Sequence, residues 1–291
     1  MDIRVLRYYL AVCSEGTMSK AAQVCHVTQP TLSRQIADLE REMGCTLLER
    51  GARQVKLTEK GFYLRRRAEE IVALADQTQD DLKAGEGIVE GDVRIGAGES
   101  LGVRAVAAVI RAFREEHPQV RFRFHSGNAV EVTERLEHGL IDLAVLIDYS
   151  DIARYEHMRL RPTDAWCVLV PTDSPLAAKD AISPDDLAGL PLIVSEQALE
   201  RDTLSGWFGA HMGELNVVAT YNLVFNAVML ARERVGCVLT LDGLTTLGPE
   251  SGLVSRTLFP PVVSPIDVAW IRGQPRTLAV DRFIAALRVS V

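Results

Sequence analysis

Three polar side chains, Gln29, Ser33 and Arg34, stand close together in the stretch VTQPTLSRQIADLE. On a helical wheel Pro30, Arg34, Ala37 and Arg41 would point away from the apolar stripe, with Gln29 and Ser33 on its shoulder. Side chains of these types form the hydrogen bonds that read base edges, and arginine also binds phosphate. The stretch is therefore a candidate nucleic-acid contact, although an ordinary amphipathic helix would show the same periodicity.

Local signals predict that this stretch is the second helix of a helix-turn-helix. Thr28 is a good N-cap, and Pro30 falls in the first turn, where no backbone N–H is needed. The residues that recur at helical spacing and should be buried are Leu32, Ile36, Leu39 and Met43. A shorter helix should precede it in TMSKAAQVCHV, with Thr17 as N-cap and Ala21 and Ala22 allowing a close helix crossing.

A basic hairpin is predicted after Gly44. In CTLLERGARQVKLTEKG, apolar and polar residues alternate on both sides of RGAR, which places Arg50 and Arg53 near the tip. Residues 1–67 contain twelve Lys and Arg against seven Asp and Glu, whereas residues 68–291 contain twenty against thirty-two. The formal net charge of −7 thus conceals a basic N-terminal part, which indicates either a phosphate-binding patch or a solvated helix face.

The N-terminal region resembles the DNA-binding domain of LysR-type transcriptional regulators, over EGTMSKAAQVCHVTQPTLSRQIADLEREMGCTLLERGARQVKLTEKG. The likeness lies in the paired alanines, the Thr-Gln-Pro entry to the helix, SRQI, and the Leu-Thr before Gly61. It departs at Leu48 and Thr17, where the family usually has Phe and Ser. The resemblance implies a winged helix-turn-helix that binds double-stranded promoter DNA. The predicted DNA-binding residues are Thr28, Gln29, Pro30, Ser33, Arg34, Arg50, Arg53, Lys56 and Thr58.

A long helix is predicted after the wing, from Thr58, which can cap it, to about Lys83. Its apolar residues suit packing against a second copy of the helix, and packing within one chain is the alternative. These residues are Phe62, Leu64, Ile71, Leu74 and Leu82, with Val72 and Ala75 beside them. In the family this linker helix is the dimer contact, so the resemblance implies a homo-oligomer, either a dimer or a tetramer of two dimers. The glycine-rich KAGEGIVEGD marks the next boundary.

From Val93 onward the sequence alternates strand and helix patterns, which predicts a parallel sheet with helices on its faces. The strand candidates are DVRIGAG, VRFRFHS, LIDLAVLID, AWCVLVP and LPLIVSE. The glycines of GAGESLG are spaced G-x-G-x-x-x-G, and no acidic residue clearly ends a second strand, so a dinucleotide site is not expected. The turn at Ser100 still suits binding of a small polar or anionic group.

This part of the chain resembles the family's effector domain, in HPQVRFRF, GLIDLAV, VLVPTDSPLA, DDLAGLPLIV and VGCVLT. The resemblance implies two Rossmann-like subdomains, similar to those of periplasmic binding proteins, with a small-molecule effector in the cleft between them. Candidates for the cleft lie at strand ends: Ser100, Ser126, Asn128, Asp148, Ser195, Glu196, Asn222 and Thr240. Asp148 and Glu196 favour a ligand with donors or positive charge, although both carboxylates could equally be solvated.

The predicted fold is thus an α+β multidomain protein. Residues 1–58 form the winged helix-turn-helix, 59–88 the linker helix and 89–291 the effector domain, in which subdomain I comprises 89–161 and 266–291 and subdomain II comprises 162–265. The chain is expected to cross between subdomains near Leu160–Asp164 and to return near Pro265–Val268.

Other classes of function find little support in the sequence. The five cysteines and six histidines show no metal-ligand spacing, so neither a metal nor a cofactor is predicted. The cysteines are expected to be small buried hydrophobes, with a redox pair of Cys167 and Cys237 as the alternative. Because Walker and H-E-x-x-H motifs are missing, no enzyme activity is expected.

No apolar run reaches the roughly 18 residues of a membrane span, and the N-terminus does not read as a signal peptide, which predicts a cytoplasmic protein with no membrane partner. The resulting hypothesis is a LysR-type regulator of promoter DNA that responds to a small molecule, with RNA polymerase as a further partner. The alternative is an intracellular solute-binding module whose N-terminal head mainly dimerises.

Overall fold

The computed structural model describes residues 1–50, 54–83, 88–199, 202–245 and 251–290. It divides into two compact units, Met1–Ala84, which we call the head, and Gly85–Val291, which we call the effector unit. Among the described residues, no helix is both long enough and apolar enough to cross a membrane.

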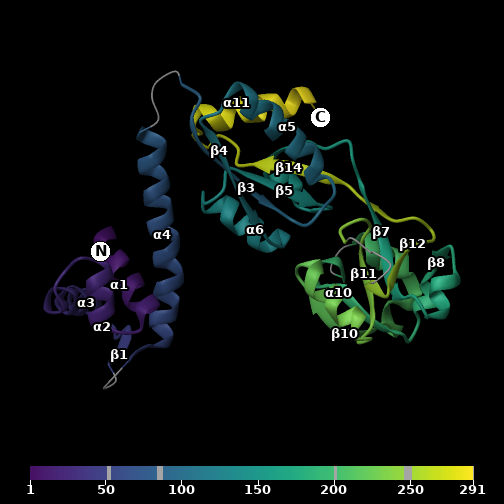
Figure 1. The fold of residues 1–291 in the computed structure, drawn as a ribbon, viewed down its shortest axis with the longest axis horizontal. Coiled ribbons are helices and arrows are strands. Elements are labelled where there is room, and N and C mark those ends of the chain that lie inside the picture. Colours follow the sequence, from purple (N-terminus) through teal and green to yellow (C-terminus); the bar gives the residue numbers. More distant parts are fainter. Residues whose placement is uncertain (51–53, 84–87, 200–201, 246–250, 291) are drawn as a thin grey trace. The chain divides into compact units, whose positions relative to one another are not determined.

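The head is a small helical domain followed by a two-stranded hairpin and a long helix (Figure 1). Its elements are α1 (Ile3–Glu15), α2 (Met18–Val24), α3 (Gln29–Met43), β1 (Leu48–Arg50), β2 (Val55–Leu57) and α4 (Glu59–Lys83). The two strands pair antiparallel, with Leu48 opposite Leu57. The hairpin predicted on either side of RGAR is therefore present, with Arg50 as the last residue of its first strand.

Short-range caps set the helices of the head. Thr17 and Thr28 are the N-caps of α2 and α3, as predicted, and each accepts a hydrogen bond from a backbone N–H three residues on. Leu32, Ile36 and Leu39 are buried, whereas Met43 is 38% exposed, so its predicted burial was wrong. Met43 is the last residue of α3, and the chain then turns at Gly44, whose φ of +64° is left-handed, so the helix ends before this side chain reaches the core.

Helix α4 belongs partly to the core of the head. Leu64 and Ala68 are buried against it, so Leu64 does not face a second copy as the sequence had suggested. Arg7 of α1 forms a two-pronged ion pair with Asp76 of α4, which holds the two helices together. Four other predicted positions of α4 are exposed apolar side chains: Phe62, Ile71, Leu74 and Leu82.

The first sheet of the effector unit is covered by helices on both faces (Figure 1). Its strands, in spatial order, are β4 (Val120–Ser126), β3 (Gly91–Ala97), β5 (Leu143–Ile147), β14 (Ile266–Trp270) and β6 (Glu156–Arg159). Alternate residues of β5 face opposite sides. Leu143 and Val145 pack with α5 (Val103–Glu116) and α11 (Leu278–Ser290), whereas Ala144 and Leu146 pack with α6 (Ala129–Glu137).

The second sheet is built in the same way. Its strands, in spatial order, are β10 (Asn216–Tyr221), β9 (Pro191–Ser195), β11 (Cys237–Leu241), β7 (Asp164–Pro171), β12 (Leu253–Leu258) and β8 (Ala181–Ile182), with β13 (Val263–Ser264) beside β7. Helix α10 (Val224–Arg232) packs on one face. The other face carries α7 (Pro184–Leu187), α8 (Glu196–Leu199) and α9 (Asp202–Phe208). Short 3-10 turns complete the unit at η1 (Ile152–Arg154), η2 (Pro175–Ala178) and η3 (Gly209–Glu214).

Both sheets are mixed, which corrects the expectation of a parallel sheet. Strands β3, β4 and β5 are parallel to one another, but β14 runs antiparallel to β5 and β6, and β7 runs antiparallel to β11 and β12. The chain passes from the first sheet to the second between Arg159 and Asp164 and returns between Ser264 and Ile266. Neighbouring strands are parallel when a helix connects one to the next. A strand that the chain reaches by crossing from the other sheet has no such connection to its neighbour, so it can run antiparallel.

Cys167 and Cys237 lie on opposite faces of the second sheet. Cys167 packs in the cluster around α10, and Cys237 packs in the cluster on the other side. Burial raises the pKa of both thiols, that of Cys167 to about 12. The two residues are therefore buried, unreactive thiols and not a redox pair.

Candidate nucleic-acid interface and ligand cleft

The N-terminal end of α3 presents an open polar surface. Gln29, Pro30 and Arg34 are exposed and Ser33 is partly exposed. The hydroxyl of Thr28 accepts the N–H of Thr31 at 3.4 Å, which fixes the first turn. This turn contains no acidic residue, so nothing in it opposes the positive end of the helix dipole. The surface can accordingly receive a phosphate or the acceptor edge of a base.

The hairpin adds further basic side chains. Lys56 of β2 is exposed and lies opposite Glu49 of β1. Arg50 ends β1 opposite Val55, and the predicted wing residue Arg53 lies outside the described residues. The arrangement suits contact with a phosphate backbone, because such contacts come from basic side chains on an exposed hairpin.

Glu40, to which the sequence assigned no role, ties α3 to the hairpin. Its Oε1 accepts the backbone N–H of Leu47 at 2.7 Å and of Leu48 at 3.0 Å. The partners are seven and eight residues away across a turn, a separation that no helical or strand period would reveal. Glu40 therefore fixes where the hairpin stands relative to α3.

Thr58, one of the predicted DNA-binding residues, has internal partners. Its hydroxyl donates to the carbonyl of Thr46 at 2.8 Å and accepts the N–H of Gly61 at 3.0 Å, so it caps α4. The glycine is required for close packing, since a Cβ at Gly61 would lie 2.2 Å from the carbonyl oxygen of Leu47. The hydroxyl of Thr58 is thus engaged in holding the hairpin to α4.

The effector unit contains a cavity lined by residues of both sheets and their adjoining helices. Its volume is about 80 Å³, several times the roughly 10–15 Å³ that one water molecule requires. The predicted residues that line it are Asn128, Ser195, Asn222 and Thr240. Four residues far apart in the sequence are therefore brought to one cavity near the ends of their strands, which is where open α/β sheets bind ligands.

The structure places the other four predicted residues outside this lining. Ser126 is exposed at the end of β4, and Glu196 is exposed at the start of α8. Asp148 donates its N–H to the carbonyl of Pro265 at 2.8 Å, beside the crossing segment. Ser100 is buried, and its hydroxyl accepts the N–H of Gly102 at 2.8 Å. Adjacent residues at a strand end point to different sides, so the end of a strand does not by itself predict a cavity contact.

Two lining residues that the sequence did not single out reach across the cavity. Glu99, before α5, accepts the N–H of Val224 at the first turn of α10, at 2.5 Å to Oε2. Gln197 of α8 accepts the N–H of Ala129 at the first turn of α6, at 3.0 Å to Oε1. Each sheet's side of the cleft thus supplies an acceptor to a helix N-terminus on the other side. The available signal was an acidic residue inside the glycine turn GAGESLG.

The cavity is otherwise apolar or internally bonded. The Tyr221 hydroxyl donates to the carbonyl of Leu239, and Trp166 Nε1 donates to the Ser264 hydroxyl, both at 2.9 Å. Burial raises the pKa of Tyr221, so it stays neutral. Glu99 is the one charged side chain among the described residues that line the cavity. The aromatic residues therefore add apolar surface, and the charge of the described lining is negative.

Asp164, the first residue of β7, is a buried carboxyl beside the cleft. It is 3% exposed, and Oδ2 has no hydrogen-bond partner among the described residues. Burial raises its pKa, while the Ser100 hydroxyl and the N–H groups of Gly102 and Leu101 act in the opposite direction. The loop before α5 thus contacts the crossing segment through Ser100 and the cleft through Glu99.

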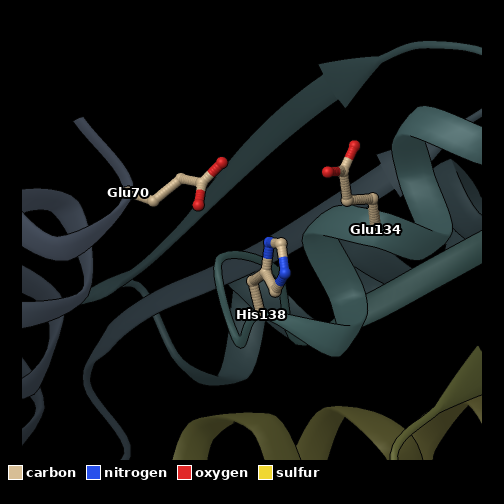
Figure 2. A group of neighbouring side chains, drawn as sticks. All are labelled: Glu70, Glu134 and His138. Atoms are coloured by element: carbon tan, nitrogen blue, oxygen red, sulfur yellow. The ribbon is translucent and has the colours of Figure 1, made fainter. Parts of the chain in front are cut away.

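Glu134 and His138 lie one helical turn apart, on α6 and directly after its end (Figure 2). The His138 N–H donates to the carbonyl of Glu134 at 3.0 Å, which closes the last turn of the helix. A zinc site requires three or four protein ligands, and these two side chains supply only two. They therefore give no reason to assign a metal centre to the effector unit.

Comparison with known protein families gives two matches. Residues 3–62 match the bacterial regulatory helix-turn-helix protein model of the lysR family, and residues 87–290 match the LysR substrate binding domain. The first match lies within the head, and the second covers nearly the whole effector unit.

Individual relatives agree with these matches. The chain is 26% identical over 275 residues to the uncharacterised HTH-type transcriptional regulator YybE of Bacillus subtilis, covering 94% of each protein. It is 38% identical over 142 residues to the HTH-type transcriptional regulator BenM of Acinetobacter baylyi, covering 49% of this chain and 46% of BenM. Its fold is similar to that of full-length CbnR in the crystal structure of its complex with target DNA, with a TM-score of 0.76, 21% identity and 100% coverage of both chains.

Proposed function

The chain belongs to the LysR family of transcriptional regulators, and from this premise we propose which of its residues contact DNA and where its effector binds. The family membership establishes a regulator with a helix-turn-helix and an effector-binding domain. The observation that carries the residue-level proposal is the exposed N-terminal end of α3, which bears Gln29 and Arg34 and has no acidic residue in its first turn.

In the proposed complex, α3 enters the major groove. Gln29, Ser33 and Arg34 read base edges, while Thr28 and Pro30 shape the first turn that approaches the phosphates. The hairpin, through Arg50, Arg53 and Lys56, contacts the sugar-phosphate backbone and contributes affinity without sequence preference. Thr58 acts indirectly, because its hydroxyl holds the hairpin to α4. The complex of CbnR with its target DNA supports this use of the fold.

Capture of genomic DNA fragments by the full-length protein at physiological salt, followed by sequencing, tests the proposal. We expect enrichment of a small set of sites that share an interrupted palindrome. Arg34→Ala should weaken that preference by roughly 1–3 kcal/mol if it removes one interaction with a base. Lys56→Ala is the matched comparison, because a phosphate contact should weaken cognate and random DNA alike. Equal losses for both variants on both kinds of DNA would contradict the assignment.

We further propose that α4 mediates assembly. Its exposed apolar side chains Ile71, Leu74 and Leu82 lie on one side of the helix and form a surface that a second copy of α4 would bury. The proposed assembly is a dimer or a tetramer of two dimers, which would place heads on two half-sites of an operator. RNA polymerase is the proposed further partner at the promoter, and the cytoplasm, as the compartment that holds promoter DNA, is the proposed location.

The proposed effector site is the cavity lined by Asn128, Ser195, Asn222 and Thr240. A small molecule bound there would stabilise one arrangement of the two sheets over another, and it can shift DNA binding only if its affinity differs between these states. In this mechanism the cleft binds and releases its ligand unchanged, so the proposed role is regulation and not catalysis.

A further inference from the structure

Two hydrogen bonds cross the ligand cavity of the effector unit, and they are similar in geometry but different in charge. Glu99 accepts the N–H of Val224 at 2.5 Å, and Gln197 accepts the N–H of Ala129 at 3.0 Å. Both donors belong to first turns of nine-residue helices, α10 and α6. The N-terminus of a helix is the place where a protein most readily binds an external anion.

The N-terminus of α10 lacks a local cap. The residue before it, Leu223, has no side-chain oxygen, so the helix makes no side-chain cap of its own. In contrast, α6 has Asn128, whose side chain accepts the N–H of Glu131 at 2.9 Å. The carboxylate of Glu99 therefore takes the place at α10 that a local cap or an external anion would otherwise take.

We infer that Glu99 is a built-in anion of the cleft, and that the cleft therefore selects a neutral or cationic small molecule bearing N–H or O–H donors and rejects carboxylates. This inference rests on the proposed function of the cavity as the effector site. A carboxylate has about four acceptor positions, of which Val224 uses one, so Glu99 can also receive donors from a ligand. A carboxylate ligand would find the N–H of Val224 occupied and a like charge beside it.

The rest of the described lining agrees with this selection. It contributes no Lys, Arg or His that could pair with an anion, and its polar side chains are amides and hydroxyls, including Asn222, Ser195 and Thr240. Trp166 and Tyr221 have their polar atoms bonded inside the protein, so they offer aromatic surface. A small amide, amidine or amine attached to a short apolar group has the matching chemistry.

Three probes of the same planar shape and size test the charge preference: acetate, acetamide and acetamidinium. Their dissociation constants are measured by ligand-observed NMR on the full-length protein at constant ionic strength. Wild type should bind acetamidinium at least about tenfold more tightly than acetate, the ratio that corresponds to about 1.4 kcal/mol. Glu99→Ser, which opens the N–H of Val224 to an external anion, should invert this order, because acetate can then take the place of the missing carboxylate.

Two further variants keep the test decisive. Glu99→Gln retains an acceptor oxygen for Val224 without the charge, so it should fold normally and bind the three probes with similar affinity. Glu116→Ser removes an exposed acid from the last turn of α5 and should keep the wild-type order. An unchanged order in both Glu99 variants, or no binding of any probe to wild type and variants, would overturn the inference.

Footprinting of Glu99→Ser on the operator separates this inference from the proposed function. If the cleft regulates DNA binding, loss of a bond across it should change the footprint. An inverted probe order with a wild-type footprint would leave the role of Glu99 intact and contradict the regulatory role of the cleft. A changed footprint with an unaltered probe order would support the regulatory role of the cleft and contradict the role inferred for Glu99.

Discussion

The two functional regions of this regulator use the ends of helices in opposite ways. In the head, the N-terminal end of α3 carries exposed Gln29 and Arg34 and has no acidic residue in its first turn, so the polar side chains of this surface are open to solvent. In the effector unit, the first turns of α6 and α10 receive acceptors from across the cleft, Gln197 and Glu99. The surface at the start of α3 is therefore open to an external anion, whereas the first turn of α10 already binds an internal carboxylate.

This difference has an energetic consequence. DNA gains the electrostatic attraction of the exposed basic side chains of the head, so association should be fast and strongly dependent on salt. A ligand of the cleft must either bind beside Glu99 and Gln197 or compete with the bonds they form. The cleft is accordingly suited to selective binding of small molecules, and the head is suited to binding DNA through its charge.

The salt dependence of DNA binding is the largest effect that this comparison predicts. For about 6–10 phosphate contacts, affinity should fall by roughly 10³–10⁵-fold between about 50 and 200 mM salt, since each contact contributes about −0.9 to the log-log slope. Lys56→Ala should reduce the slope by about one, because it removes one interaction with a phosphate. Glu116→Ser in the effector unit should leave it unchanged. Fluorescence anisotropy titrations on a cognate duplex measure these slopes, and a flat response in wild type would contradict the proposed role of the head.

Removal of the Glu40 carboxylate should have the next largest effect. Glu40→Ala leaves the N–H groups of Leu47 and Leu48 without their acceptor, which should cost about 1–3 kcal/mol of stability in the head. Because the hairpin would lose its fixed position, affinity for cognate and random DNA should both decline. Denaturant unfolding and DNA titration check these two results.

Glu40→Gln is the matched control, since its amide oxygen can still accept both N–H groups. If Glu40→Ala unfolds at the wild-type denaturant concentration and binds DNA normally, the hairpin must be held by its other contacts, such as Thr58 with Thr46. In that case the head would depend less on a single internal carboxylate than the cleft depends on Glu99.

The sequence predicted the head better than the cleft, for a physical reason. The caps at Thr17 and Thr28 and the buried stripe of α3 depend on residues within one or two turns, so local spacing indicates them. Met43 was misplaced because the stripe continued in the sequence after the helix had reached its end. The contact of Glu40 with the hairpin was not indicated, since it depends on how the turn after Gly44 folds back.

In the effector unit, strands and helices were also indicated by local patterns, but strand direction and side-chain partners were not. The mixed sheets follow from the two crossings of the chain, which leave no local pattern. Glu99 and Val224 are 125 residues apart, and an acid in a glycine turn gives no indication of its partner. Asn128 and Thr240 line the cavity, whereas Ser126, two residues before Asn128, is exposed, because the direction of each side chain depends on the twist and end of its strand.

The pH dependence of stability that arises from Asp164 should be the smallest effect. Hydrogen-bond donors around Ser100 offset part of the increase in pKa that burial of this carboxyl causes. Burial raises the pKa of Asp164 above 3.8, so the folded protein binds this proton more tightly than the unfolded chain does. The contribution of Asp164 to stability is therefore fully present below pH 3.8 and is lost as the pH rises through the folded pKa. Asp164→Asn remains neutral, so it should unfold at a higher temperature than wild type near neutral pH, and the difference should shrink toward about pH 4.

Thermal unfolding of the effector unit within the full-length protein, followed across this pH range, measures the difference. Asp180→Asn, which changes an exposed carboxyl of the same unit, should match wild type throughout. A lower unfolding temperature for Asp164→Asn at neutral pH would mean that the N–H groups of Leu101 and Gly102 stabilise an ionised carboxylate more than burial opposes it. The loop before α5 would then bind one internal anion, Asp164 at the crossing, and supply another, Glu99, to the first turn of α10, which would strengthen the contrast with α3.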